Sequence, residues 1–160
     1  MQQLLSESKI KDIQGLITSA RLSHNYSDIM YSIRCSRTIL IEALSFWGPF
    51  EKEKSNFNVK VVFTQFEGKF PPERENDEVV IDKFETFAEA KNSEMFVVQC
   101  PREVRVEKGK WFRIRFQLNG SDTCVCTSIS NNYYLNNCDT EFEFFDSSHQ
   151  IPEIQFRIVE

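Results

Sequence analysis

Apolar and polar residues alternate along most of the chain from about residue 26 onward. In the segment WFRIRFQL, the even positions from 112 to 118 are apolar, whereas Arg113, Arg115 and Gln117 occupy the odd positions. This period of two is typical of a strand with one buried face. Strand-like patterns are found at residues 29–35, 38–48, 58–66, 78–87, 94–100, 103–109, 111–120, 123–129, 140–147 and 153–160.

Turn-forming residues separate these segments, for example Gly48-Pro49, Asn119-Gly120 and Asn136-Asn137. No helical pattern alternates with the strands, which argues against a doubly wound α/β fold. Roughly ten short strands, spaced about 8 to 15 residues apart, predict an all-β fold with an antiparallel sandwich or barrel over residues 26–160.

The first 25 residues show a different period. Ile10, Ile13 and Ile17 recur at helical spacing, with polar residues between them. The pattern predicts an N-terminal amphipathic helix over residues 2–21, within a helix-and-linker region of residues 1–25. Because an isolated helix of this length is marginal in water, its apolar side must pack, either on its own domain or on a partner chain.

Composition narrows the class of protein. The chain has 160 residues, 41% hydrophobic and including 15 Phe, which suits one folded domain with a substantial core. Its net charge is -5 and it has no basic stripe, so direct binding of nucleic acid is not expected. No apolar run approaches the roughly 20 residues of a membrane-spanning helix, and no membrane association is expected.

The cysteines indicate a reducing compartment. There are five, an odd number, and the first residues lack the apolar core of a signal peptide. We therefore expect reduced thiols in a cytoplasmic or nuclear protein. Cys124, Cys126, Cys138 and His149 do not have the spacing of a zinc site, so no metal is expected.

No constellation of catalytic residues is found. His24 and His149 lie in no metal-binding or nucleophilic motif, and the sequence has no Gly-rich phosphate loop. Glu141 and Glu143 are two apart on a predicted strand, which is typical of a solvated face rather than of an acid–base pair. We expect a non-enzymatic protein without a cofactor.

Aromatic residues provide the candidate contact site. Phe46 and Trp47 end one predicted strand, and Tyr133, Tyr134 and Leu135 lie in an Asn-rich segment predicted to be a loop. Exposed aromatic side chains in loops are typical of protein–protein contact surfaces. The alternative is that these side chains fold back and cover one end of the sandwich.

The ordered set of segments resembles the PHR domain, the β-sandwich module of very large Pam/Highwire ubiquitin-ligase proteins and of some BTB-domain proteins. The similarity covers about residues 26–160 and is carried by YSIRCSRTILIEALSFWG, FNVKVVFTQFEGK, FVVQCPREVRVEKGKWFRIRFQLNG, TEFEFFDSS and the terminal phrase QIPEIQF. Gly48 is kept from a glycine-rich region of the family, whereas His149 stands where the family has glycine, so the chain resembles a divergent member.

The resemblance implies a sandwich that recruits a protein partner or substrate, possible contexts being a ubiquitin-ligase or another multiprotein assembly. It also implies that Ser121 and Asp122, in a loop at one end of the sandwich, contact the partner. Two other functions stay open: a structural subunit that docks through Ile10, Ile13 and Ile17, and a lectin-like sandwich that binds a glycan or another small ligand.

Overall fold

The computed structural model is built almost entirely of β-strands. It describes residues 9–10, 17–22, 29–50, 52–66, 78–126, 132–136, 139–145 and 153–159. No α-helix occurs in these ranges, and therefore none that could cross a membrane. The strands are β1 (Lys9–Ile10), β2 (Ile17–Leu22), β3 (Ile29–Cys35), β4 (Ile39–Trp47), β5 (Lys54–Phe66), β6 (Glu78–Lys91), β7 (Met95–Val106), β8 (Trp111–Asn119), β9 (Thr123–Cys126), β10 (Asn132–Leu135), β11 (Thr140–Phe145) and β12 (Glu153–Ile158).

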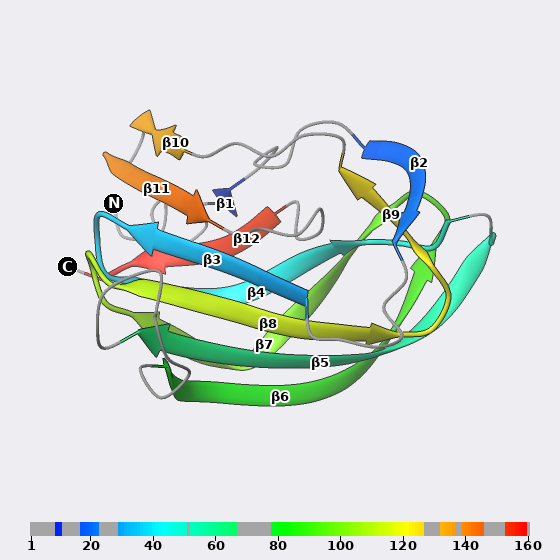
Figure 1. The fold of residues 1–160 in the computed structure, drawn as a ribbon, viewed down its shortest axis with the longest axis horizontal. Helices are drawn as coiled ribbons and strands as arrows, with labels where there is room; N and C mark the ends of the chain where they lie inside the picture. The colour runs from blue at the N-terminus through cyan, green and yellow to red at the C-terminus, as the bar shows by residue number, and fades with distance from the viewer. Residues whose placement is uncertain are drawn as a thin grey trace.

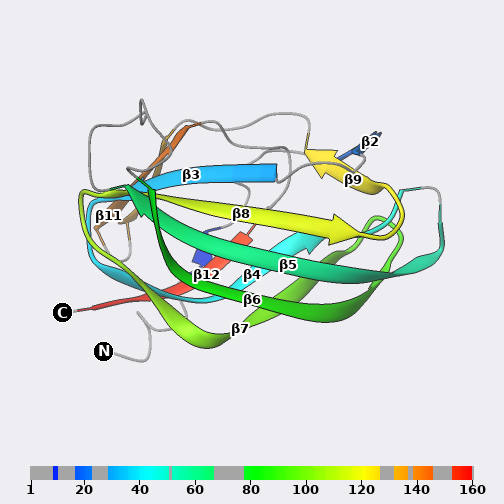
Figure 2. The ribbon, with the colours of Figure 1, turned by 60° about the horizontal axis from the view of Figure 1, so that its bottom comes forward.

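Two antiparallel sheets contain most of these strands (Figure 1). One sheet has the order β1-β12-β4-β7, and the other has the order β10-β11-β3-β8-β5-β6. A separate pair is formed by β2 and β9. In Figure 2 the sheet with β3, β8 and β5 lies over the sheet with β12, β4 and β7. The predicted all-β, antiparallel architecture is confirmed for the described residues, and the two layers form a sandwich.

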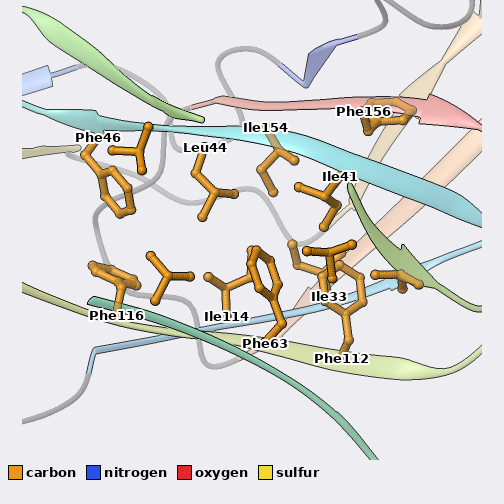
Figure 3. Close-up of a cluster of buried hydrophobic side chains, with 14 of the residues drawn as sticks. Ile33, Ile41, Leu44, Phe46, Phe63, Phe112, Ile114, Phe116, Ile154 and Phe156 are labelled. Carbon is orange, nitrogen blue, oxygen red and sulfur yellow. The ribbon is translucent and has the colours of Figure 1, made fainter. Parts of the chain in front are cut away.

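The core lies between the inner faces of the two sheets. Figure 3 shows Phe46, Leu44 and Ile154 projecting from one sheet toward Phe116 and Ile114 of the other. The Phe46 ring centroid is 5.2 Å from that of Phe116 and 5.7 Å from that of Phe96. The alternation seen in the sequence therefore produces a continuous aromatic and aliphatic layer that is removed from water.

The N-terminal segments differ from the sequence prediction. Where we predicted a helix, the structure has the strands β1 and β2, which contain Ile10 and Ile17; Ile13 and the other residues of this region outside the two strands are not among the described residues. β1 pairs with β12 and β2 pairs with β9, so both segments add to sheets of their own chain. The physical reason is that a sheet edge satisfies the backbone of a segment too short to form a stable isolated helix.

β7 joins two segments that we predicted as separate strands. Pro101 lies inside it, in a bulge where residues 100–103 of β7 face Glu42 of β4 alone. β7 is the edge strand of its sheet, where a missing backbone N–H and an extra loop of chain are tolerated. Proline thus interrupts the pairing without ending the strand.

Candidate protein-contact surface

The Asn-rich segment that we predicted as a loop forms β10, the edge strand of the six-stranded sheet. β10 pairs with β11 so that Tyr134 lies opposite Glu141. Tyrosine favours extended backbone, and the pairing gives the segment hydrogen bonds that a loop would lack. The loop prediction was therefore wrong for Tyr133, Tyr134 and Leu135.

The residues of β10 have different environments. Tyr134 is 53% exposed, and its hydroxyl donates a hydrogen bond to the carboxylate of Asp139. Leu135 is half-buried and packs against the core. Tyr133 pairs with Phe142, and its side chain lies outside the described part of the structure. Tyr134 is thus the described side chain of this trio that is available to a partner.

Phe46 is the clearest correction to the predicted contact residues. Its side chain is fully buried between the sheets, because it shares the inward face of β4 with Leu44. Trp47, the next residue, is half-buried and lies opposite Met95 of β7. Only the second of this aromatic pair therefore reaches the surface.

Ser121 and Asp122 lie near the end of β4. The backbone N–H of Phe50 donates to the Asp122 carbonyl at 2.9 Å, which ties the turn after β8 to the turn after β4. The Ser121 hydroxyl is buried and has no hydrogen-bond partner among the described residues. These residues and Trp47 share one end of the sandwich, whereas β10 lies toward the other end in Figure 1, so the predicted residues do not form one surface.

Four strands instead bring a different set of side chains together. Asn132 of β10 lies opposite Glu143 of β11, Glu143 lies opposite Arg34 of β3, and Arg34 lies opposite Trp111 of β8. Residues that lie directly opposite each other in antiparallel strands share one face of the sheet. Arg34 donates to the Glu143 carboxylate at 2.6 Å, and its guanidinium carbon lies 5.1 Å from the Trp111 ring centroid.

Two adjoining hollows mark the same area. The larger, about 410 Å³, is lined by Ser36, Arg37, Tyr134, Asp139 and Glu141. The smaller, about 110 Å³, shares Ser36 and Glu141 with it and extends to Arg34 and Glu143. We define the contact surface as Arg34, Ser36, Trp111, Tyr134, Glu141 and Glu143.

Sequence reasoning missed Arg34 and Trp111 because their significance depends on strand pairing. Arg34 and Glu143 are 109 residues apart in the chain, and only the order β11-β3-β8 places them beside Trp111. Within the sequence, Arg34 is one polar position of an alternating strand. No local signal distinguishes it from other solvated arginines.

A second polar cluster lies on the same sheet, around Glu78 at the start of β6. Arg115 donates two hydrogen bonds to its carboxylate, at 2.8 and 2.5 Å, and Thr64 donates a third. Arg113 lies 3.7 Å from the same carboxylate and donates to the Ser32 hydroxyl at 3.0 Å. The Arg113 guanidinium carbon also lies 4.7 Å from the centroid of the Phe66 ring.

The environment of Glu78 keeps it ionised. Burial alone would raise the pKa of Glu78, but the hydrogen bonds from Arg115 and Thr64, together with the charges of Arg115 and Arg113, lower it below its ordinary value. A carboxylate held in this way is a poor proton donor at neutral pH. We therefore interpret this cluster as part of the structural framework of the sheet and not as an acid–base site.

Two cysteine side chains, those of Cys35 and Cys100, are described in the structure. Cys35 is fully buried and Cys100 is half-buried. Burial, with a smaller contribution from the charge of Asp82, raises the pKa of Cys100 to about 12, so its thiol stays protonated. Among the described side chains, no three of His, Cys, Asp and Glu gather where they could hold a metal ion.

Comparisons with known proteins add no assignment. The sequence matches no protein-family model and no curated protein.

Proposed function

We propose that this chain is a non-catalytic protein-interaction module that binds a partner or substrate through the contact surface on β10, β11, β3 and β8. The observation that carries the proposal is the cross-strand row of Glu143, Arg34 and Trp111 on one face of the sheet, with Tyr134 beside it in the neighbouring row, opposite Glu141. Tyrosine, arginine and tryptophan are the residue types that most often dominate binding energy in protein interfaces.

The chemistry of the surface supports binding rather than catalysis. Arg34 and Glu143 form an ion pair, and between a third and two fifths of each side chain is exposed. A partner that binds here therefore meets an ion pair that is already formed. The adjoining hollow beside Tyr134 gives a partner side chain room to insert. A charged pair flanked by aromatic rings suits recognition of a mixed polar and apolar protein surface.

For the type of module, we infer a divergent PHR-like domain. The support is the ordered set of segments ending in QIPEIQF together with an antiparallel sandwich of two sheets. Under this inference the partner is a protein recruited into a larger assembly, for which a ubiquitin ligase is one context.

The test is affinity capture from an extract of the source cells, with the wild-type chain and an Arg34→Ala/Tyr134→Ala variant as baits. Arg34 is partly exposed and Tyr134 is more than half exposed, so the variant should keep the fold. We expect a reproducible set of proteins that the wild-type chain captures and the variant does not. Trp111 is left unchanged because its side chain is half-buried.

A matched control is Val97→Ala, which removes an exposed apolar side chain from β7 of the other sheet. It should capture the same proteins as the wild type. Capture of an unchanged set by the Arg34/Tyr134 variant would show that binding uses another surface.

A further inference from the structure

β6 is a long edge strand that carries exposed apolar side chains. It spans 14 residues and forms the lower margin of the molecule in Figure 1. Val79, Val80, Ile81 and Phe87 are between 36% and 76% exposed, and Phe87 is the most exposed of them. Large apolar side chains concentrated on one edge strand mark a surface that another chain can cover.

The other sheet edges are shorter or interrupted. β1 and β10 have two and four residues, and β7 is broken by the bulge around Pro101. β6 pairs with β5 along its whole length with a one-residue bulge at Ile81, and it is regular from Asp82 to Lys91; within the described ranges no strand pairs with its opposite edge. β6 therefore presents a long row of backbone donors and acceptors that can extend the sheet, in which the Lys83 N–H would exchange its present hydrogen bond to the Asp82 carboxylate, at 2.8 Å, for one to the second copy.

The exposed side chains of β6 are complementary to themselves. Ile81, Lys83, Glu85 and Phe87 alternate with less exposed residues and share the outer face. In an antiparallel pair of β6 strands centred on Phe84, Lys83 of each copy lies opposite Glu85 of the other, and Ile81 lies opposite Phe87. Opposite charges and apolar pairs at directly opposed positions both stabilise antiparallel pairing.

Neighbouring registers are less favourable. Residues that lie opposite each other in an antiparallel pair share a face of the sheet, so the exposed residues of one copy must lie opposite exposed residues of the other. The alternative registers therefore differ from this one by moving the central residue along β6 one position at a time. Centring on Glu85 places this carboxylate opposite itself, and centring on Thr86 places Phe87 opposite Glu85. The register about Phe84 is the one that matches both the charges and the apolar side chains.

We propose that two copies of this chain associate through antiparallel pairing of β6 about Phe84, which joins their six-stranded sheets into one continuous sheet. The contact surface lies at the opposite edge of the same sheet, around β10. The dimer therefore leaves both contact surfaces open and presents them as a pair, which increases avidity for a partner with two binding sites. The dimer rests on β6 and does not depend on the proposed partner.

The test measures self-association of the full chain by sedimentation equilibrium. In the proposed register, Lys83→Glu creates two Glu–Glu contacts per dimer and Glu85→Lys creates two Lys–Lys contacts. Each variant alone should self-associate about tenfold or more weakly than the wild type. An equimolar mixture of the two variants should recover wild-type association, because the glutamate introduced in one copy then lies opposite the lysine introduced in the other.

Glu89→Lys is the matched control, since Glu89 lies opposite Val79 in this register. This variant should dimerise like the wild type. In the register about Thr86, by contrast, the introduced lysine would lie opposite Lys83, and the repulsion between the two would weaken the dimer. Circular dichroism of every variant confirms that the exposed substitutions leave the fold intact. A monomeric wild type, or a mixture that associates no better than its components, would overturn the proposal.

Discussion

Glu78 connects three strands of the six-stranded sheet through its carboxylate. Its side chain is almost fully buried, as is that of Arg113, and its partners Arg115 and Thr64 come from β8 and β5. Removing one partner of a buried charged group leaves the others uncompensated, which is far more destabilising than losing an exposed pair. The sheet therefore depends on this single acidic residue more than on its surface ion pairs.

Glu78→Gln should lower the free energy of unfolding by about 3 kcal/mol, because the amide cannot neutralise Arg115 and Arg113. Urea denaturation at neutral pH and fixed protein concentration measures the change. Glu107→Gln is the control, since the Glu107–Arg105 pair is exposed and its loss should cost much less than the loss of Glu78. Equal effects of the two substitutions would contradict a special role for Glu78.

The pH dependence of stability should also trace to Glu78. Its pKa in the folded chain is lowered from the ordinary value of 4.5, so its contribution is complete above that value and is lost as the pH falls through the folded pKa. We expect the difference in unfolding free energy between wild type and Glu78→Gln to be constant near neutrality and to shrink as the solution becomes more acidic than 4.5. A difference that persists unchanged in acid would mean that Glu78 is not the titrating group.

At the scale of elements, the end of β4 packs closely against the turn between β6 and β7. The Gly48 N–H donates to the Glu94 carbonyl at 2.8 Å. A Cβ atom on Gly48 would lie 2.2 Å from the Lys91 carbonyl oxygen and 2.8 Å from that of Glu94. Backbone atoms cannot move aside as a flexible side chain can, so only glycine fits here.

Gly48→Ala should therefore destabilise the chain by about 2 to 3 kcal/mol through overpacking. Thermal unfolding followed by circular dichroism gives the shift. Gly109→Ala makes a useful comparison, because Gly109 has open space around it but a φ of 75°, which costs a residue with a Cβ about 1 to 2 kcal/mol. Gly109→Asn should recover most of that smaller loss, whereas Gly48→Asn should be at least as damaging as Gly48→Ala.

Strands with one strongly buried face could be predicted from the sequence, and strands defined by their partners could not. The segment 29–35 coincides with β3, and 111–120 contains β8, because alternate residues of each face the core. β10 was missed because its asparagines resemble a loop until β11 supplies its hydrogen bonds. We predicted β7 as two strands because proline normally ends a strand; Pro101 is tolerated inside β7 because β7 is an edge strand, which the sequence alone does not reveal.

The candidate site was predictable to a smaller extent than the fold. Tyr134 was chosen as an exposed aromatic residue, and its side chain is exposed. Phe46 was chosen for the same reason, although the alternation of β4 places it inward with Leu44 and leaves Trp47 outward. Arg34 and Trp111 became neighbours only through the pairing of β3 with β8, which spacing along the chain does not reveal.

At the scale of the whole molecule, the hydrophobic core and the contact surface lie on opposite faces of the same sheet. The inner face of the six-stranded sheet meets β4 and β12 in the core, and the outer face bears the contact surface. The open edge of β6 lies at the far side of that sheet from β10. Substitutions in these three places should therefore have separable effects on folding, partner binding and self-association.

Phe46 provides the decisive comparison, because it was first a candidate contact residue and is a core residue in the structure. Phe46→Ala should lower the free energy of unfolding by about 3 to 5 kcal/mol, since the cavity would remove ring contacts with both Phe96 and Phe116. Phe46→Leu should cost less than about 1.5 kcal/mol, and Tyr134→Ala less than about 0.5 kcal/mol. If Phe46→Ala were as stable as the wild type in urea denaturation, the ring would not be part of the core. The same three variants in the capture experiment separate the two roles: Phe46→Leu should keep the partner because it keeps the fold, whereas Tyr134→Ala should weaken capture without a loss of stability.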